Sequence, residues 1–549
     1  MAATLDRRNP HRQPPGKAPH PLPDAPGNAA EGIPDALRWL IVLAAMTGAV
    51  LEVLDTTITA TALPQIQGNI GATLSEVGWV NTGYIIANVI VLPMAGWLAG
   101  RFGRGGYFAG AIALFTFASL MCGLSHSLNA LVFWRVVQGL GGGGLLATGQ
   151  VILLEAFPPK QQGIATALFG VGVTVGPLLG PVLGGWLTEN LSWPWIFYIN
   201  LPFGIAAVVL TRLFVPDGVG QGKGSEAAKT PIDFFGIGLL AAGMGSLQAV
   251  LERGQEEDWF DSRFIVNSAL VAALALSAFA WWELRAAHPV LNLRVLRNRS
   301  LTAGALFGAV LGFGLYGTIF LLPIYQQNLL GYNAYASGSV QFRPAIFGML
   351  SFMTAGILSQ KADARALLAF GTVLFILCPW GLSHLTTLSG DGDVFLPLAA
   401  RGFSLGFLFI PLTLASLGSL PSEDRDTGSG VVNFMRQFGG SVGIATLTTV
   451  LTRRADFHRA ALVSHLSDGN PAVREWLAGA QAQMAAHGMG EAAAHAGALG
   501  QLNAVVQKQA TMLSFNDCFL VVAVAFLLAL PLVFLFQKSA GGAGAGAAH

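Results

Sequence analysis

The sequence predicts an all-α membrane protein with about fourteen transmembrane helices: two six-helix bundles in a pseudo-twofold repeat, with two further helices inserted between them. Of the 549 residues, 53% are hydrophobic and only 11% are charged, whereas soluble globular chains carry about 25% charged residues. Apolar runs recur along the chain and are separated by short polar turns. Lysine and arginine gather in alternate turns, which is typical of a polytopic membrane protein.

Each expected span holds enough apolar residues to cross the hydrocarbon core of a bilayer as a helix. The spans follow a proline-rich segment, residues 1–36, which lacks the apolar core of a signal peptide and is expected to be a disordered cytoplasmic tail. We expect the spans near residues 38–63, 77–99, 107–126, 129–154, 162–188, 195–215, 233–252, 263–283, 301–329, 337–359, 366–386, 395–419, 428–452 and 513–536.

The orientation of the chain follows from its basic residues. Arg101 and Arg104 lie in one short turn, Lys361 and Arg365 lie in another, and the intervening short loops hold almost no lysine or arginine. The positive-inside rule therefore places both termini in the cytoplasm. The long segment 453–512 then lies outside, where its alanine- and glutamine-rich sequence is expected to form surface helices. Residues 537–549 are expected to be a flexible cytoplasmic tail.

An internal repeat divides the chain. Three short features of the first half recur in the same order about 260 residues later, and parallel repeats of this kind build alternating-access transporters with a central site between the halves. The matched pairs are residues 63–67 with 322–326, 96–101 with 356–361, and Arg135 with Arg401. We therefore expect an N-terminal bundle at 37–215, two linker transmembrane helices within 216–300, and a C-terminal bundle at 301–536 that includes the outer loop 453–512.

Two acidic residues interrupt the first apolar run. Glu52 and Asp55 are three residues apart, so a helix presents both on one face. A charged side chain near the bilayer centre costs at least roughly 2.5–3.5 kcal/mol and is by default a sign of function. Two acids facing a common cavity could exchange protons, which makes both candidates for proton coupling. The alternative is that one of them only bonds a neighbouring helix.

Residues 96–104 form the cytoplasmic turn between the second and third spans. Gly96 and Gly103 permit a tight turn and close helix approach. Arg101 and Arg104 can bind helix C-termini or acids on the other half and so latch one conformation. The alternative is that these arginines only orient the chain in the membrane.

Arg135 opens the fourth span, within the stretch 133–139. A guanidinium at this depth needs a partner or water. It would favour the ionised form of a nearby acid and thereby help to time proton release. The alternative is an interfacial arginine bonded to backbone carbonyls.

Residues 176–185 are the most specific stretch of the chain. Glycines spaced by four give a smooth strip on one helix face, which lets two backbones approach closely, and prolines bend the helix. The combination suits a rocking interface that also seals against ions, although ordinary packing of small residues is the alternative. The residues of this glycine–proline strip are Gly176, Pro177, Gly180, Pro181 and Gly184.

Several other side chains are candidates for a substrate pocket or for further charge. The substrate-binding candidates are Tyr84, Gln138, Tyr325 and Gln327. An aromatic residue in an apolar helix is more often a packing residue than a ligand. Arg343, Arg436 and Asp517 lie at or inside expected spans, and each is either functional or merely interfacial.

The motifs of several other function classes are missing from the sequence. The run Gly141–Gly144 lacks the Gly-Lys-Ser/Thr ending of a phosphate-binding loop, and no HExxH or GxSxG motif occurs. The three cysteines form no CxxC pair. We therefore expect neither an ATP-driven pump nor an enzyme, and no cofactor or metal site.

These stretches resemble the major facilitator superfamily, and within it the fourteen-span drug–proton antiporters of the EmrB/QacA type. The resemblance is closest to the EmrB branch and runs from about residue 38 to 536. It is carried by residues 54–64, the 96–104 turn, residues 135–139, the glycine–proline strip, residues 193–202 and residues 433–440.

The resemblance implies proton-driven export of amphipathic or hydrophobic drugs across a bacterial inner membrane. Asp55 matches the family's first-span acid, Arg135 its fourth-span arginine, and the glycine–proline strip its antiporter motif. It also implies a periplasmic adaptor (EmrA-like) and an outer-membrane channel (TolC-like), for which the segment 453–512 is a candidate contact. Two departures stand out. Gly100 replaces the usual Asp of the cytoplasmic turn, which weakens the acid half of the latch, and Glu52 is an additional acid.

Other readings of the sequence stay open. They are an uptake symporter for a nutrient, an exporter of one endogenous organic acid or siderophore, a membrane receptor without transport, and a membrane enzyme. The glycine–proline strip favours antiport over these readings.

Overall fold

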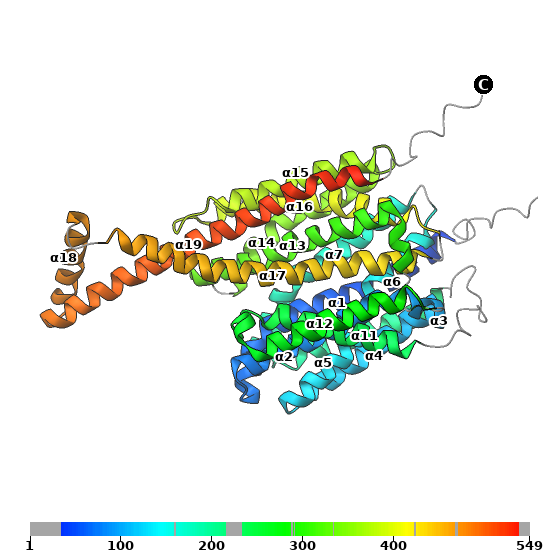
Figure 1. The fold of residues 1–549 in the computed structure, drawn as a ribbon, viewed down its shortest axis with the longest axis horizontal. Helices are drawn as coiled ribbons and strands as arrows, with labels where there is room; N and C mark the ends of the chain where they lie inside the picture. Colours follow the sequence, from blue (N-terminus) through cyan, green and yellow to red (C-terminus); the bar gives the residue numbers. More distant parts are fainter. Residues whose placement is uncertain are drawn as a thin grey trace, which may run out of the picture.

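The computed structural model describes residues 34–158, 161–215, 233–286, 289, 291, 293–332, 334–421, 424–466 and 470–536. Long helices run side by side along the length of the molecule (Figure 1). Eleven stretches among these residues are long and apolar enough to cross a membrane. The expected tails, 1–36 and 537–549, lie almost entirely outside the described residues.

The N-terminal part of the chain packs into one bundle around a shared apolar core. Three of its expected spans are interrupted, the one at 195–215 by a single turn residue, Ile199. The span at 77–99 breaks at a short 3₁₀ turn that contains Pro93, because proline cannot donate to the helical ladder. The helices are α1 (Asp35–Ile70), α2 (Leu74–Val91), α3 (Ala95–Phe102), α4 (Arg104–Gly123), α5 (Leu128–Gly142), α6 (Leu145–Ala156), α7 (Gln162–Asn190), α8 (Trp195–Tyr198) and α9 (Asn200–Phe214).

The second interruption divides the fourth expected span into α5 and α6. The helix ends at Gly142 and restarts at Leu145. A Cβ on Gly143 would overlap the backbone of Asn88 in α2, so only glycine allows α2 to approach this closely. The break gives the bundle an additional helix N-terminus in its interior.

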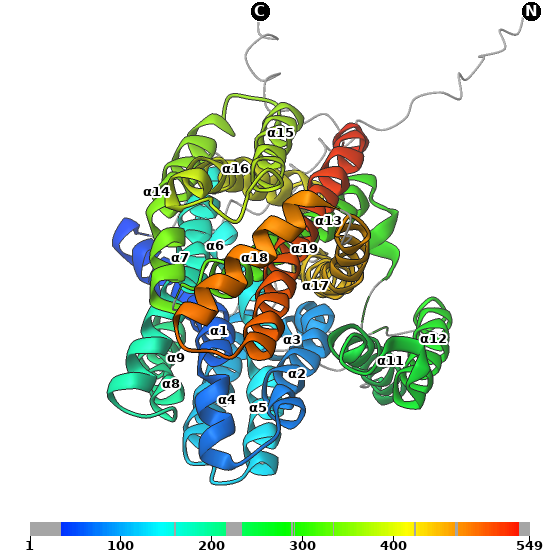
Figure 2. The ribbon, with the colours of Figure 1, turned by 90° about the vertical axis from the view of Figure 1, so that its left-hand side faces the viewer.

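The remaining helices form a flanking pair and a second bundle. The pair, α11 (Phe234–Arg253) and α12 (Arg263–Glu283), lies at the side of the molecule beside α2 (Figure 2). The second bundle has its own core. Its helices are α13 (Arg299–Asn328), α14 (Ala334–Leu358), α15 (Ala364–Leu382), α16 (Asp391–Leu417), α17 (Arg425–Ser464), α18 (Pro471–Ala486) and α19 (Glu491–Ala529).

Three helices build a projection at one end of the molecule. The outer end of α17 and the first part of α19 run past the bundles, and α18 packs against α19 at the tip (Figure 1). Asp517 of α19 fixes the base of this projection, because its carboxylate bonds Arg454 at 2.5 Å and His458 at 2.7 Å, both on α17. Most of the described residues of the segment 453–512 are helical, with turns between the helices at 465–466, 470 and 487–490.

Candidate functional site

A buried carboxylate lies inside the N-terminal bundle. Asp55 of α1 has no exposed surface. Arg135 of α5 donates from Nη1 to its Oδ2 at 2.5 Å, and Gln138, one turn along α5, donates to Oδ1 at 2.9 Å. Asn200, the first residue of α9, donates to Oδ1 at 3.0 Å. Two helices besides its own therefore hold the Asp55 carboxylate and satisfy its charge.

The guanidinium of Arg135 is fixed as firmly as the acid. It has no exposed surface, and its Nε donates to the carbonyl oxygen of Val80 at 3.1 Å. Its Cζ lies 4.2 Å from the ring centroid of Tyr84 and 5.7 Å from that of Phe197. A buried arginine needs such a set of partners, and an aromatic face adds cation–π attraction.

One hydroxyl aligns the two amides that bind Asp55. Ser119 of α4 accepts from Gln138 at 3.1 Å and from Asn200 at 3.0 Å, and it donates to the carbonyl oxygen of Phe197 at 3.1 Å. Neither Ser119 nor Asn200 was a predicted site residue. A single uncharged polar residue in an apolar helix gives little signal, although Asn200 lies in the stretch 193–202 that carries the family resemblance.

Glu52 occupies a separate polar site one helical turn away from Asp55. Its Oε1 accepts from Asn88 of α2 at 3.0 Å, and its Oε2 accepts from the backbone N–H of Leu146 at 2.9 Å. Leu146 is in the first turn of α6, so the carboxylate caps the helix that begins inside the bundle. Free N–H groups and the helix dipole both favour a negative charge at such an end. The two acids therefore have different partners.

The glycine–proline strip packs α7 directly against the helix that carries Asp55. A Cβ on Gly176 would meet Val53 and Leu54, and one on Gly184 would meet Ile58 and Thr61. The strip thus faces α1 within the same bundle. Further along α7, Gly163 and Gly170 lie against Gly356 and Phe352 of α14, and Val182, within the 176–185 stretch, lies near Gly338 of α14. The side chains of Pro177 and Pro181 lie outside the described residues.

We expect Gly180→Val to destabilise the protein and reduce transport. The Cβ of the new residue would overlap the side chain of Thr57, and overpacking of this kind costs typically about 1–3 kcal/mol. Gly185→Val is the matched control, because a Cβ at Gly185 meets nothing within 4 Å. Thermal unfolding of the purified variants measures the difference, and equal melting temperatures would show that this face needs no glycine.

The cytoplasmic turn contacts the second bundle. Gly103 has φ +78°, and Arg104 follows it as the first residue of α4. Arg104 is buried and bonds Asp426 of α17, with its Nε 3.0 and 3.1 Å from the two carboxylate oxygens. It also forms an ion pair with Glu155 of α6. Asp426 thus supplies an acid although Gly100 replaces the usual Asp of the turn.

The other residues of the turn lie around this ion pair. A Cβ on Gly96 would overlap Thr427 of α17, so the turn and α17 are in close contact. Arg101 lies with its Cζ 5.9 Å from the Trp97 ring centroid. Neither Asp426 nor Glu155 was a predicted site residue, because each acid stands near the end of an apolar run, where charges are common.

A buried polar cluster continues the contact between the bundles. Gln150 of α6 donates to Thr413 of α16 at 3.0 Å and accepts from Asn433 of α17 at 3.2 Å. Ser429 of α17 donates to the carbonyl oxygen of Ala147 in α6 at 3.2 Å. Together with the Arg104–Asp426 ion pair, these bonds join α4 and α6 to α16 and α17.

The four predicted substrate-binding residues do not lie together. Tyr84 and Gln138 both contact Arg135 in the N-terminal bundle. Tyr325 is buried in the core of the second bundle, where its ring centroid lies 5.8 Å from that of Phe515. Gln327 is exposed at the end of α13. The first two residues and the last two therefore lie in different bundles. On α13, Tyr325 and Gln327 also lie on different faces of the helix, which the sequence pattern left open.

The chain was compared with known proteins. The profile of the Major Facilitator Superfamily matches residues 45–444. The multidrug export protein EmrB of Escherichia coli (strain K12) is 34% identical over 512 residues, which cover 93% of this chain and 98% of that protein. The fatty acid resistance protein FarB of Neisseria gonorrhoeae is 32% identical, with 92% and 98% covered.

A solved structure shows the same fold. The crystal structure of the human organic anion transporter MFSD10 matches with a TM-score of 0.56 at 14% identity, covering 90% of this chain and 100% of that chain. At this identity the likeness concerns the fold alone.

Proposed function

Because this chain belongs to the major facilitator superfamily and is therefore a multi-pass membrane transporter rather than an enzyme, we propose that it is a proton-coupled multidrug efflux antiporter. It exports amphipathic or hydrophobic compounds across a bacterial inner membrane by alternating access. The observation that carries the proposal is the fully buried Asp55–Arg135 ion pair in a chain 34% identical to a multidrug export protein.

The proposal includes a fourteen-span topology with both termini in the cytoplasm. Three helices, α7, α14 and α17, run within the bundles in addition to the eleven apolar stretches. The proposed units are a six-helix bundle at 37–215, two linker spans within 216–300, and a six-helix bundle at 301–536 with its periplasmic segment 453–512. The contact of α11 with both α2 and α17 is consistent with a pair inserted between two bundles.

The proposed coupling depends on the charge of Asp55. With the site open to the outside, Asp55 takes up a proton, which removes its attraction to Arg135 and loosens the bonds from Gln138 and Asn200. With the site open to the cytoplasm, drug binding and the positive charge of Arg135 favour release of that proton. Proton and drug must stabilise opposite states for this exchange to drive export. Glu52 is proposed as a second proton site.

The contacts at the cytoplasmic ends of the bundles support a state that is closed to the cytoplasm. The Arg104–Asp426 ion pair and the Gln150 cluster join the bundles on the side where the basic turns lie. We propose that these contacts form the inner gate, and that they break when the transporter opens to the cytoplasm.

An efflux assay on a panel of amphipathic compounds tests the function. Cells that express the full chain should retain less of several unrelated compounds than cells with an empty vector, and an uncoupler should abolish the difference. Export that persists with the uncoupler would contradict proton coupling. Export of one compound alone would contradict a multidrug function.

The projection built by α17, α18 and α19 is the proposed contact for a periplasmic adaptor (EmrA-like), which would lead on to an outer-membrane channel (TolC-like). Its surface is largely exposed, including Trp476 of α18 at 40%. A photo-crosslinking residue at position 476 should capture an adaptor in intact cells. The same residue at position 102, which is 61% exposed at the cytoplasmic turn, is the control. Capture of the adaptor from position 102 alone would contradict the assignment.

A second candidate is the export of a specific organic acid. It is favoured by Arg436 of α17, which is buried beside Asn433 in the contact between the bundles, with its Nη2 2.5 Å from the Asn433 side-chain oxygen. A cation at this position would suit a carboxylate. Competition between a panel of organic acids and a panel of cationic dyes would separate this candidate from the first. A non-transporting receptor would show no efflux in either panel.

A further inference from the structure

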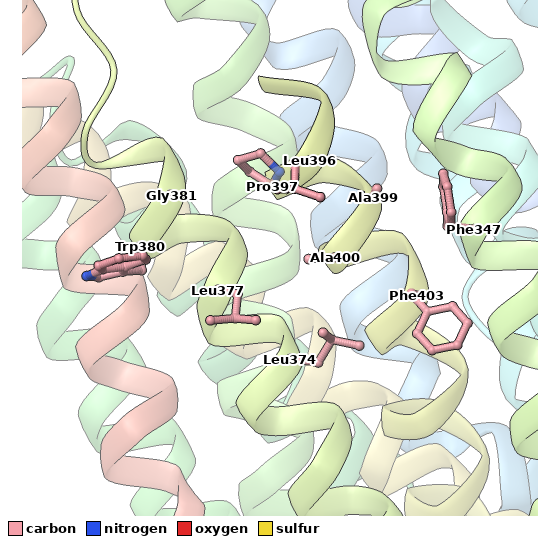
Figure 3. A pocket seen from close by; sticks show the side chains of 10 residues that line it. All are labelled: Phe347, Leu374, Leu377, Trp380, Gly381, Leu396, Pro397, Ala399, Ala400 and Phe403. Carbon is pink, nitrogen blue, oxygen red and sulfur yellow. The ribbon is translucent and has the colours of Figure 1, made fainter. Parts of the chain in front are cut away.

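An apolar groove opens on the outer half of the second bundle, away from the Asp55 site. It has a volume of about 460 Å³, and its walls come from α14, α15 and α16. Figure 3 shows Trp380 at one side and Phe347 at the other, with Leu377 and Ala400 between them. We call this the α15–α16 groove. Its ten lining residues are Phe347, Leu374, Leu377, Trp380, Gly381, Leu396, Pro397, Ala399, Ala400 and Phe403.

The shape of the groove depends on small and bent residues. A Cβ on Gly381 would lie 2.9 Å from the Pro397 ring, so a larger residue there would close one end. Pro397 lies inside α16, where it removes a backbone hydrogen bond and bends the helix. Leu377, Trp380 and Leu396 are 47%, 54% and 74% exposed. The groove therefore opens toward lipid.

A single charge lies beside the groove on the lipid-facing side of α14. Phe342, Ile346 and Leu350 are all about half exposed and form an apolar stripe, and Arg343 is exposed within it. Arg343 is one helical turn outward from Phe347, which lines the groove. It makes no ion pair with any residue in the part of the chain that the structure describes.

The depth of Arg343 suits the phosphate of a lipid. The ring of Phe347 lies 6.2 Å from that of Phe395, which is one turn from the outer start of α16 at Asp391. Arg343, one turn outward from Phe347, therefore lies near the level of the outer helix ends. Helical side chains lean toward the N-terminus, which is the outer end of α14 in the proposed topology, and a long arginine side chain extends to the interface in this way. The acids at the outer start of α16 are engaged elsewhere, since Asp391 accepts from Tyr332 and Asp393 accepts from the Gly390 N–H.

We propose that the α15–α16 groove binds one acyl chain of an anionic phospholipid from the outer leaflet, with the lipid phosphate held by Arg343. The planar guanidinium can donate two parallel hydrogen bonds to a phosphate. The apolar walls accept the chain, and the open side admits it laterally from the bilayer. This site is separate from the Asp55–Arg135 ion pair of the other bundle.

Native mass spectrometry of the purified full chain tests the proposal with defined lipids. Dioleoylphosphatidylglycerol should be retained as one tightly bound copy, and dioleoylphosphatidylcholine should bind more weakly. Arg343→Gln should weaken the phosphatidylglycerol complex by about fivefold and the phosphatidylcholine complex less, because the choline cation of that lipid already offsets the charge of its phosphate. Ala400→Phe, which fills the groove, should reduce retention of both lipids.

Two control variants outside the groove and competition with oleate complete the experiment. Arg212→Gln, at an exposed arginine at the end of α9, and Ala273→Phe, at an exposed alanine of α12, should leave lipid retention unchanged. Arg343→Lys keeps the charge and should retain most of the binding. It replaces Arg343→Gln as the test variant if that protein is poorly folded. Equal retention of both lipids, or no effect of either test variant, would overturn the proposal. Oleate competing better than phosphatidylglycerol would show a substrate portal in its place.

Discussion

Asp55→Asn is expected to abolish proton-driven efflux while the protein still inserts and folds. Asparagine keeps the size of the side chain and can still accept from Gln138 and Asn200, which both bond the Asp55 carboxylate. It removes the titratable group and leaves the Arg135 guanidinium, which has no exposed surface, without its counter-ion. Drug accumulation in energised inside-out vesicles, which reports export, should fall to the level of vesicles without the transporter, because no proton is exchanged for the drug.

A control variant separates lost coupling from lost structure. Thr56→Ser, on the half-buried face of α1 next to Asp55, should keep most of the efflux. Removal of one partner of a buried pair is costly, by about 3–5 kcal/mol, so expression and thermal unfolding of Asp55→Asn are measured in parallel. Full efflux by a folded Asp55→Asn protein would contradict the assignment of this residue.

Asp426→Asn is expected to open the cytoplasmic side and to reduce transport at least tenfold. Asp426 is the carboxylate that α17 contributes to Arg104 of α4, and the variant leaves Arg104 paired with Glu155 of its own bundle. Loss of charge-assisted hydrogen bonds between the bundles destabilises the closed arrangement by about 1.5–3 kcal/mol. A change of that size shifts a two-state equilibrium by a factor of about 10 to 150. The variant should therefore spend more time open to the cytoplasm and bind protons from outside less often.

The labelling rate of an introduced cysteine measures this opening. Ala147 is buried at the contact between α6 and α17, and the three natural cysteines are buried. In inside-out vesicles, Ala147→Cys should react slowly with a membrane-impermeant maleimide and much faster when combined with Asp426→Asn. Asp363→Asn, which removes an acid that caps α15 instead of joining the bundles, is the control. Equal labelling rates in all three backgrounds would contradict the inner-gate assignment.

The transmembrane helices and the two charged residues Asp55 and Arg135 could be predicted from the sequence. Charges inside apolar runs are costly, so Asp55 and Arg135 were noticeable even though 80 positions separate them. That the two residues bind each other was not predicted, because the sequence pattern does not show which helices pack together. Glu52 was noticeable by the same argument, and its binding to the first turn of α6 was not, because a continuous apolar run gives no sign that the helix breaks at Gly143.

The partners of the charged residues were harder to predict. Ser119 and Asn200 are uncharged, so burying them among hydrogen-bond partners leaves no pattern in the sequence. Asp426 lies 322 positions from Arg104, at the start of a helix where an acid is ordinary. The substitution at Gly100 suggested a weakened latch, whereas the structure supplies the acid from another helix. Contacts between bundles depend on three-dimensional packing, which helical periodicity does not encode.

The most direct test of the proposed mechanism is the proton count that accompanies drug binding at Asp55. The purified protein, in weakly buffered detergent solution with a pH-sensitive dye, is mixed with a compound that the efflux panel identifies as a substrate. The mechanism predicts that the drug releases protons from the wild-type protein and that Asp55→Asn releases fewer while it still binds the drug. Equal proton release from both proteins at saturating drug would contradict the assignment of Asp55 as the coupling site.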